Sequence, residues 1–530
     1  LLAELSMIVL VSLLQLLSGS RMKKITFIFL IVFLVTFFWQ NRVNIVLWTL
    51  PKILNITKPV SSEGSSNWQE GPLEKNNEDQ RPNIILILAD DLGFNDISLY
   101  NGGAGNGSLM TPNIDRIALE GVTFKNGYAA NAMCAQSRAS IMTGKHHVRV
   151  NITDWIPGVD PKDRYLIGPE DIHQLPIEEL TIGEILQSNG YSTMYSGKWH
   201  LGSQGFYPEN HGFDINKGGF EKGSPMGGYY SPYKNPRLSD GPEDEYLTDR
   251  LTEESISFIK ERDKNKPFAV FLSFYNVHTP IQPNLKHIDY YKDKLKTYSD
   301  TTTQTDIEGD AISVLNQRNP DYASMVHSTD ENIGKVISFL KQRNLYDNTL
   351  IIFTSDNGGL STQAKVAPTS TKPLRAGKGW LYEGGIRIPQ LIKYINQKQQ
   401  DLNNVPVVSY DLFTTIVNHL KLDYIDEKKD GIDLSNLSKE KNKRDYILWH
   451  FPHYHASLWK PGSAIRNGDW KLLKFYEENK LELYNLKDDL SEQTDLSSKY
   501  PLVVKKLSYK MDEMLAEMDG KVPTINQNLN

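Results

Sequence analysis

The chain has 530 residues, of which 39% are hydrophobic and 23% are charged, and its formal net charge is −6. This composition is typical of a globular protein and excludes a chain that is disordered throughout. The net negative charge gives no reason to expect nucleic-acid binding, which needs a basic face. The length is sufficient for one large α/β domain and a smaller second one.

The N-terminus has the features of an export segment. Residues 25–39 form an unbroken apolar run, ITFIFLIVFLVTFFW, directly after Met22, Lys23 and Lys24. A positive flank before an apolar stretch is typical of export signals, and the flank stays in the cytoplasm. We therefore expect residues 1–60 to be either an uncleaved anchor in the membrane or a cleaved signal peptide. Both interpretations predict an exported protein, periplasmic or extracellular. Residues 61–80, rich in Ser, Glu and Asn, are predicted to be a solvated linker.

Two carboxylates follow the first apolar run of the remaining chain. The run Ile84 to Ala89 is typical of a buried parallel strand, and Asp90 and Asp91 come directly after it. Adjacent carboxylates next to a buried strand are unfavourable unless a cation neutralises them. Two interpretations remain open, a solvated turn that caps a helix and a site for a hard metal ion.

The only cysteine, Cys134, lies in the segment NAMCAQSRASIMTGK at residues 131–145. It cannot form an internal disulfide, and an unpaired cysteine is unusual in an exported protein. One interpretation is a buried thiol that packs as a small hydrophobe. The other starts from a helix over the following residues, with Cys134 at its N-terminus and Arg138 one turn further on. The helix dipole and the guanidinium would then both favour an anion at this position.

Polar side chains also follow the later apolar strands. Lys198 and His200 come after the predicted strand 191–195, His278 after 268–274, and Asp356 and Asn357 after 349–354. Because Lys198 and His200 are two residues apart, their side chains would lie on one face of an extended segment. Lys378 lies in the glycine-rich segment 375–387, where backbone can approach a ligand closely. Open α/β sheets bind ligands at the carboxyl ends of their strands, so we expect these residues to form one site.

The spacing of apolar residues predicts the helices. They are expected at residues 111–120, 175–187, 246–260, 321–340 and 409–420. Strands that alternate with helices predict a large α/β domain over residues 81–440. Short strand candidates separated by turns follow, at residues 446–449, 463–465, 470–475 and 481–484, and then a last helix at 501–518. These predict an α+β subdomain at residues 441–530.

Taken together, the motifs resemble those of the type I sulfatases of the alkaline phosphatase superfamily. Residues 134–144 are similar to the sulfatase signature, and residues 197–202, GKWHLG, are similar to its second motif. The resemblance runs from about residue 82 to the C-terminal strands. It implies an α/β fold with a large mixed sheet between helices and a smaller C-terminal antiparallel sheet with one helix. It also implies that the protein hydrolyses sulfate esters.

The resemblance assigns a role to each candidate residue. A formylglycine-generating enzyme would convert Cys134 to formylglycine, whose hydrate would be the nucleophile. One calcium ion would be bound by an all-oxygen set, which suits this hard cation: Asp90, Asp91, Asp356 and Asn357. The sulfate would be held by Arg138, Lys198 and Lys378, and protons would be transferred by His200 and His278. One position departs from the family pattern, because the signature has Pro or Ala where this chain has Gln136.

The expected substrate is a sulfated carbohydrate, because residues 152–158 and 205–208 look like inserts of carbohydrate-active sulfatases. Two other functions remain open. A phosphoric ester hydrolase of the same superfamily would share the fold, although it usually has a Thr or Ser nucleophile and two metal ions. A non-catalytic, calcium-containing carbohydrate-binding homologue would keep every ligand and leave Cys134 unconverted. The sequence alone does not separate this binding protein from the enzyme.

Overall fold

The computed structural model describes residues 81–529 except 101, 103–106, 160, 301, 426–428 and 438–443. The predicted export segment and linker, residues 1–80, lie outside the described residues. Among the helices that are described, none combines the length and the apolar character needed to cross a bilayer.

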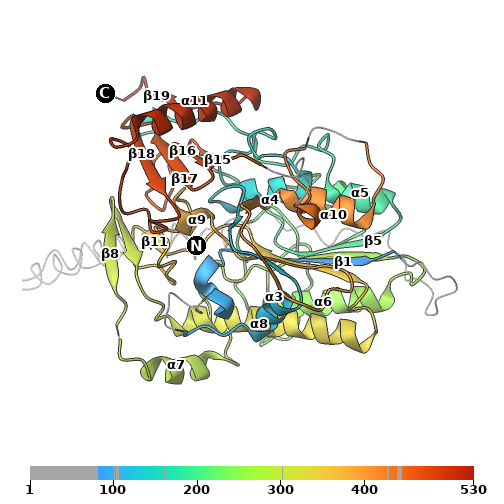
Figure 1. Cartoon of the computed structure of the whole chain (residues 1–530). Coiled ribbons are helices and arrows are strands. Elements are labelled where there is room, and N and C mark those ends of the chain that lie inside the picture. The colour runs from blue at the N-terminus through green and yellow to red at the C-terminus, as the bar shows by residue number, and fades with distance from the viewer. Residues whose placement is uncertain are drawn as a thin grey trace, which may run out of the picture. The chain divides into compact units, whose positions relative to one another are not determined.

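The centre of the structure is an eight-stranded sheet with the strand order β13-β2-β12-β10-β1-β7-β5-β6 (Figure 1). Its strands are β1 (Asn83–Ala89), β2 (Val122–Phe124), β5 (Ser192–Gly197), β6 (Ile215–Lys217), β7 (Phe268–Ser273), β10 (Thr349–Ser355), β12 (Gln390–Lys393) and β13 (Asp401–Asn403). β1 is parallel to β10 and β7, and β5 is parallel to β7. β12 is antiparallel to β10, so the sheet is mixed. The carboxyl ends of β1, β5, β7 and β10 therefore meet at one edge.

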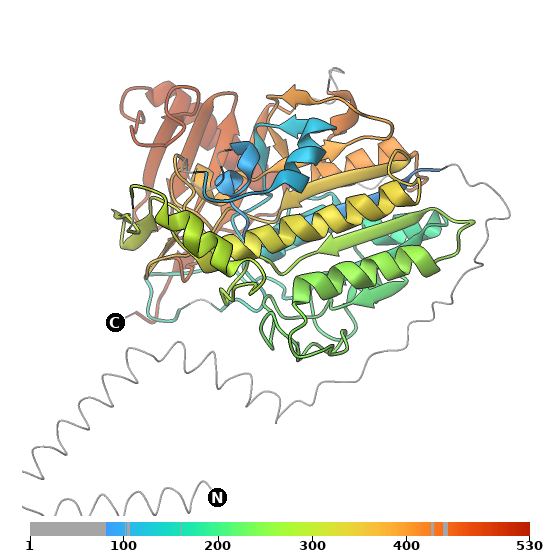
Figure 2. The ribbon, with the colours of Figure 1, turned by 90° about the horizontal axis from the view of Figure 1, so that it is seen from below.

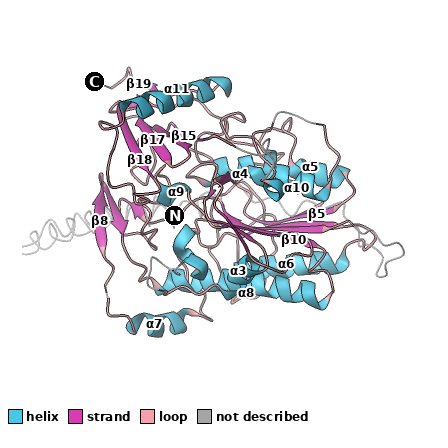
Figure 3. Cartoon of the chain, in the orientation of Figure 1, coloured by secondary structure: helices cyan, strands magenta, loops and turns pink. Residues whose placement is uncertain are grey.

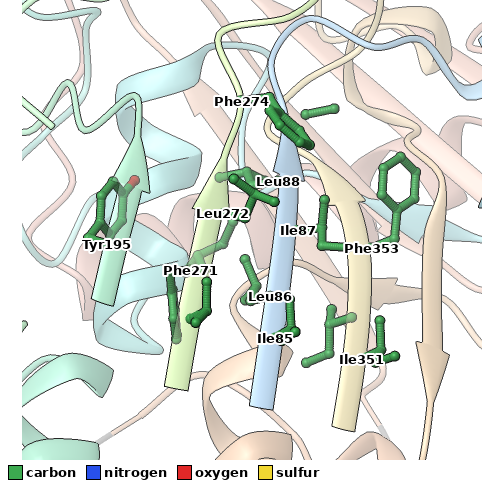
Figure 4. Close-up of a cluster of buried hydrophobic side chains, with 14 of the residues drawn as sticks. Ile85, Leu86, Ile87, Leu88, Tyr195, Phe271, Leu272, Phe274, Ile351 and Phe353 are labelled. Carbon is green, nitrogen blue, oxygen red and sulfur yellow. The ribbon is translucent and has the colours of Figure 1, made fainter. Parts of the chain in front are cut away.

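The central strands are buried on both faces, which explains their continuous apolar sequences. Ile84 to Ala89 of β1 are at most 1% exposed. Figure 4 shows the side chains of Leu86 and Leu88 among those of Phe271 and Ile351 from the neighbouring strands. A strand of this kind has little freedom to shift its register, because the shift would move this tightly packed set.

Helices cover both faces of the sheet (Figure 1, Figure 3). One face is covered by α3 (Pro112–Leu119), α6 (Leu247–Glu261) and α8 (Pro320–Gln342), and the other by α4 (Cys134–Thr143), α5 (Ile182–Ser188) and α10 (Asp411–Leu420). Figure 2 shows α8 and α6 side by side, in agreement with their direct packing. Each amphipathic helix thus buries one stripe against the sheet. The prediction of an α/β fold with a large mixed sheet is confirmed.

One helix is shorter than its pattern predicts. The spacing predicts a helix over residues 175–187, but α5 begins at Ile182. Thr181 caps it, because its hydroxyl accepts a hydrogen bond from the Glu184 amide at 3.3 Å and the Glu184 carboxylate accepts one from the Thr181 amide at 2.9 Å. Pro176 also disfavours helical backbone at Leu175. The other predicted helices and strands match their expected ranges closely.

The C-terminal region forms the predicted antiparallel sheet with one helix. Its strands are β15 (Tyr446–Phe451), β16 (Gly462–Asn467), β17 (Trp470–Phe475) and β18 (Lys480–Asn485), followed by α11 (Pro501–Glu517). One face of the sheet packs on Leu507, Met511 and Leu515 of α11. The other face shares a hydrophobic core with Tyr128 and Ile386 of the larger part of the chain. The proposed limits at residues 81–440 and 441–530 stay predictions.

The described chain has further short strands and helices. They are β3 (Gly127–Tyr128) with β14 (Val407–Val408), β4 (Leu166–Ile167) with β19 (Thr524–Ile525), the three-stranded sheet of β8 (Thr305–Glu308), β9 (Ala311–Val314) and β11 (Thr362–Gln363), and the helices α7 (Ile288–Lys296) and α9 (Glu383–Ile386). The pairing of β14 with β3 matters for the site, because β3 leads into the loop before α4.

Candidate active site

The predicted site residues meet at the carboxyl edge of the parallel strands. Asp90 and Asp91 follow β1, Lys198 and His200 follow β5, His278 lies beyond β7, and Asp356 and Asn357 follow β10. The register pairs Ala89 with Ser355, so the two acidic segments lie next to each other. The Asp91 amide donates a hydrogen bond to Asp356 Oδ1 at 3.2 Å, and Asn357 Nδ2 donates one to Asp91 Oδ1 at 2.8 Å.

Cys134 is the first residue of α4, and its sulfur faces this acidic cluster. The Sγ atom lies 3.5 Å from Asp90 Oδ1 and 3.8 Å from Asp91 Oδ1. The turn before the helix is closed by the Ser137 hydroxyl, which accepts a hydrogen bond from the Asn131 amide at 3.1 Å. The predicted helix with Cys134 at its N-terminus is therefore present.

Three cationic side chains neutralise the buried carboxylates one by one. The pairs are Arg138 Nη2 with Asp356 Oδ2 at 2.8 Å, Lys198 Nζ with Asp90 Oδ2 at 2.7 Å, and Lys378 Nζ with Asp91 Oδ1 at 2.7 Å. All six side chains are buried. Buried charges are tolerated in such numbers because each one has a counter-charge in contact. The structure thus places the three predicted sulfate-binding cations around residue 134.

The two predicted histidines differ in their surroundings. His278 Nε2 lies 3.8 Å from Asp91 Oδ2. His200 Nε2 donates a hydrogen bond to the Ile156 carbonyl at 2.5 Å, and its Nδ1 has no hydrogen-bond partner in the described part of the chain. The segment is not extended at His200, whose backbone is left-handed with φ of 62°, so the two-residue spacing no longer predicts a shared face for Lys198 and His200.

Burial and charge pairing shift the pKa values of the carboxyl groups in opposite directions. Burial raises the pKa of Asp90 to about 8, although Lys198 counteracts it. Burial also acts to raise the pKa of Asp91, but Lys378 and His278 outweigh it and hold this pKa below its usual range. The same balance, with Arg138 as the main cation, lowers the pKa of Asp356.

The thiol of Cys134 is not activated. Burial raises its pKa well above the ordinary value, and the negative charge of Asp356 raises it further. The thiol itself is therefore not the anion that the helix N-terminus and Arg138 are expected to favour, and the expectation of an anion at this position stays a prediction. A protonated thiol is a poor nucleophile, so the bare cysteine is unsuited to attack an ester.

The oxygen atoms of the cluster fit a hard cation. The carboxylates of Asp90, Asp91 and Asp356 are buried together, and the buried Oδ1 of Asn357 accepts no hydrogen bond from any described residue. An unsatisfied amide oxygen costs about 1–3 kcal/mol, which a bound cation would offset. Carboxylate and amide oxygens are the ligands that Ca²⁺ prefers. Atoms of Asp90, Asp91, Cys134 and His278 also lie within 4.8 Å of one another, which places residue 134 beside this cluster.

Two residues of the site lie outside the set predicted from the sequence. Ser273, the last residue of β7, accepts a hydrogen bond from Arg138 Nη1 at 2.7 Å. His455 lies in the loop after β15 and packs against Gly379, next to Lys378. Its Nδ1 accepts a hydrogen bond from the Ser457 amide at 3.1 Å, so the ring proton of the neutral form is on Nε2. The histidine-rich sequence of residues 450–455 was the signal for His455, and nothing local distinguished Ser273.

Comparisons with known proteins agree with this geometry. The family model described as Sulfatase matches residues 82–422, and the model described as N-sulphoglucosamine sulphohydrolase, C-terminal, matches residues 376–519. A protein named Sulfatase from Formosa agariphila is 29% identical, with 81% of this chain and 86% of that protein aligned. The human N-acetylgalactosamine-6-sulfatase is 30% identical over 63% of this chain and 61% of that protein.

A solved structure has the same fold. The crystal structure of Ps i-CgsB in complex with k-i-k-neocarrahexaose superimposes with a TM-score of 0.65 at 28% identity, and covers 82% of this chain and 92% of that one. The matched Sulfatase model includes all of the predicted site residues, from Asp90 to Lys378. The chain therefore belongs to the sulfatase family of the alkaline phosphatase superfamily and is a sulfuric ester hydrolase.

Proposed function

We propose that the protein hydrolyses sulfate esters of carbohydrates, with residue 134 converted to formylglycine and one calcium ion bound by Asp90, Asp91, Asp356 and Asn357. The observation that carries the proposal is the set of three buried cation–carboxylate pairs around Cys134. A sulfate ester is an anion, and its bridging oxygen gains negative charge as the S–O bond breaks. Fixed cations in a buried site stabilise that charge.

Conversion of Cys134 is part of the proposal because the thiol itself is protonated and inert. The hydrated aldehyde would supply an oxygen nucleophile, and the calcium ion would supply positive charge beside it. The chain holds residue 134 for this role at the N-terminus of α4, 3.5 Å from Asp90 Oδ1. A formylglycine-generating enzyme is accordingly the expected maturation partner.

Lys378 and His278 are the candidates that protonate the departing alcohol. Burial lowers the pKa of Lys378, but Asp91 outweighs burial and holds it above its ordinary value, so Nζ keeps its proton. Burial, with help from Lys378, lowers the pKa of His278 to about 3, so its ring is neutral at neutral pH. Of the two, Lys378 is the one that carries a proton at neutral pH.

His200 is the candidate proton acceptor. Its Nε2 proton is engaged by the Ile156 carbonyl, which leaves the Nδ1 lone pair available. Burial is the main cause that lowers the pKa of His200 well below its ordinary value, and Lys198 adds to it. A neutral ring in this tautomer can accept a proton at Nδ1.

The carbohydrate part of the proposal is supported by the relatives. The human relative is named N-acetylgalactosamine-6-sulfatase, and Ps i-CgsB was crystallised with k-i-k-neocarrahexaose. We also propose that the protein is exported, periplasmic or extracellular, because of the apolar residues 25–39 and their positive flank. An uncleaved segment would attach it to the membrane.

The test uses the full-length chain produced with a formylglycine-generating enzyme. The tryptic peptide of residues 126–138 should lose about 18 Da when the thiol becomes an aldehyde. Release of sulfate from a panel of sulfated oligosaccharides is then measured, with phosphate monoesters as competitors and Cys134→Ala as the blank. Faster release of phosphate would favour the phosphoric ester hydrolase. An unmodified peptide, together with sugar binding and no turnover, would favour the non-catalytic homologue.

A further inference from the structure

Gln136 stands where the sulfatase signature has Pro or Ala, and its side chain is engaged in the folded protein. The residue is fully buried in the first turn of α4. Its Nε2 donates a hydrogen bond to the Thr153 carbonyl at 3.0 Å, whereas its Oε1 has no partner among the residues described. Pro and Ala side chains have no donor and cannot make this bond. The side chain of Gln136 therefore links α4 to the segment of Thr153.

The contact ends on the loop that holds His200. Thr153 lies three residues before Ile156, whose carbonyl accepts the hydrogen bond from His200 Nε2. The loop is also held at its start, where the Asp154 amide donates to Asp171 Oδ2 at 2.9 Å and the Thr153 hydroxyl lies 2.9 Å from His453 Nε2. Gln136 thus joins the helix of residue 134 to the segment that orients the histidine.

We infer that Gln136 is a positioning residue for His200. By fixing the Thr153 carbonyl, it holds the Ile156 carbonyl where only the Nε2–H tautomer of His200 can bond to it. That tautomer leaves Nδ1 as the acceptor. This inference rests on the proposed function, because the role of His200 as proton acceptor is part of that proposal.

The charges around His200 do not select the tautomer by themselves. The charged or titratable groups with the largest effects on its ring are Lys198 from the same segment, Arg138 from α4 and His278 from the loop after β7. All three act to keep the ring neutral, and none of them is a hydrogen-bond partner of either ring nitrogen. The Ile156 carbonyl is therefore the group that distinguishes the two tautomers.

The test compares Gln136→Ala and Gln136→Met with the wild type. Alanine removes the donor and agrees with the family signature, while methionine keeps most of the volume without a donor. Ser140→Ala is the matched control, since Ser140 is a buried polar residue of the same helix whose hydroxyl has no described partner. Both Gln136 variants should lower kcat about threefold to tenfold per converted enzyme with KM unchanged, as expected for one lost hydrogen bond. The control should retain the wild-type kcat.

A second readout does not depend on activity. Nitrogen-15 NMR of histidine-labelled, unconverted full-length protein reports the tautomer of His200, assigned by comparison with His200→Gln. The wild type and Ser140→Ala should show the proton on Nε2, and both Gln136 variants should show a mixture of tautomers. A wild-type signal in folded Gln136→Ala, a wild-type kcat in Gln136→Met, or a change in KM alone would overturn the inference. A wild type that releases no sulfate would refute the proposed function, and the NMR result would still decide the role of Gln136.

Discussion

Replacement of Lys471 by Met should strongly destabilise the junction between the C-terminal sheet and the larger part of the chain. Lys471 of β17 is fully buried, and its Nζ lies 3.0 Å from Glu383 Oε1 and 2.8 Å from Glu492 Oε1. Glu383 has a second cation, Arg387, whose Nη1 is 3.4 Å from its Oε2. In Lys471→Met, Glu492 would thus be the buried carboxylate that loses its cation.

The magnitude follows from that imbalance and from pH. Breaking a buried ion pair from one side costs about 3–5 kcal/mol, and we expect the lower end, about 3 kcal/mol, because Glu383 keeps Arg387. Burial already raises the pKa of Glu492 to about 7, with Lys471 acting against it. The folded protein therefore binds the Glu492 proton more tightly than the unfolded chain does. The contribution of this proton to the free energy of unfolding is fully present below the unfolded-state pKa of the glutamate, and it is lost as the pH rises through 7. Removal of Lys471 raises the pKa further, so the loss in stability should be larger at pH 8 than at pH 6.

Urea unfolding of the full-length protein at pH 6 and pH 8 measures both effects. Lys474→Met is the matched control, because Lys474 lies on the same strand and forms an ion pair with Asp512 at 3.0 Å that is exposed to solvent. The control should lose less than about 1 kcal/mol at either pH. Equal losses for the two variants, or a loss in Lys471→Met that does not increase with pH, would refute the argument from burial.

Three further changes test the site itself. Asn357→Ala should weaken calcium binding by about tenfold or more, because it removes an oxygen ligand. The affinity is measured by calorimetry on the unconverted chain, and a variant that binds calcium as tightly as the wild type would contradict this assignment. Arg138→Lys should lower kcat/KM for sulfate release by about a hundredfold, because a lysine cannot contact both Asp356 and Ser273 at the end of β7. Near-normal turnover in this variant would exclude a role of Arg138 in holding the sulfate. His455→Ala should raise KM several-fold with a smaller effect on kcat, since its Nε2–H is a donor beside Lys378; an unchanged KM would show that the ring only packs.

The local elements of this fold could be predicted because their signals are local. The continuous apolar run Ile84 to Ala89 requires burial on both faces, and an amphipathic stretch such as 321–340 requires one buried face. The position of Asp90 and Asp91 at a strand end was equally visible, since it depends only on where the apolar run stops. The helix 175–187 was the exception, because the capping box at Thr181 outweighed the apolar spacing.

The sequence by itself therefore determined the four central parallel strands β1, β5, β7 and β10, the strands of the C-terminal sheet, most of the long helices and the family to which the chain belongs. The remaining strands of the large sheet, such as β12 and β13, carry no pattern that predicted them. Only the tertiary structure decided which charges meet. The parallel register of β1 and β10 brings Asp356 beside Asp91, and α4 brings Arg138 into contact with Asp356 and with Ser273 of β7. The inert state of the Cys134 thiol also depends on burial and on neighbours far apart in the chain. The physical reason is that pairing, desolvation and tautomer choice depend on distances of a few ångströms between distant segments, which no local pattern encodes.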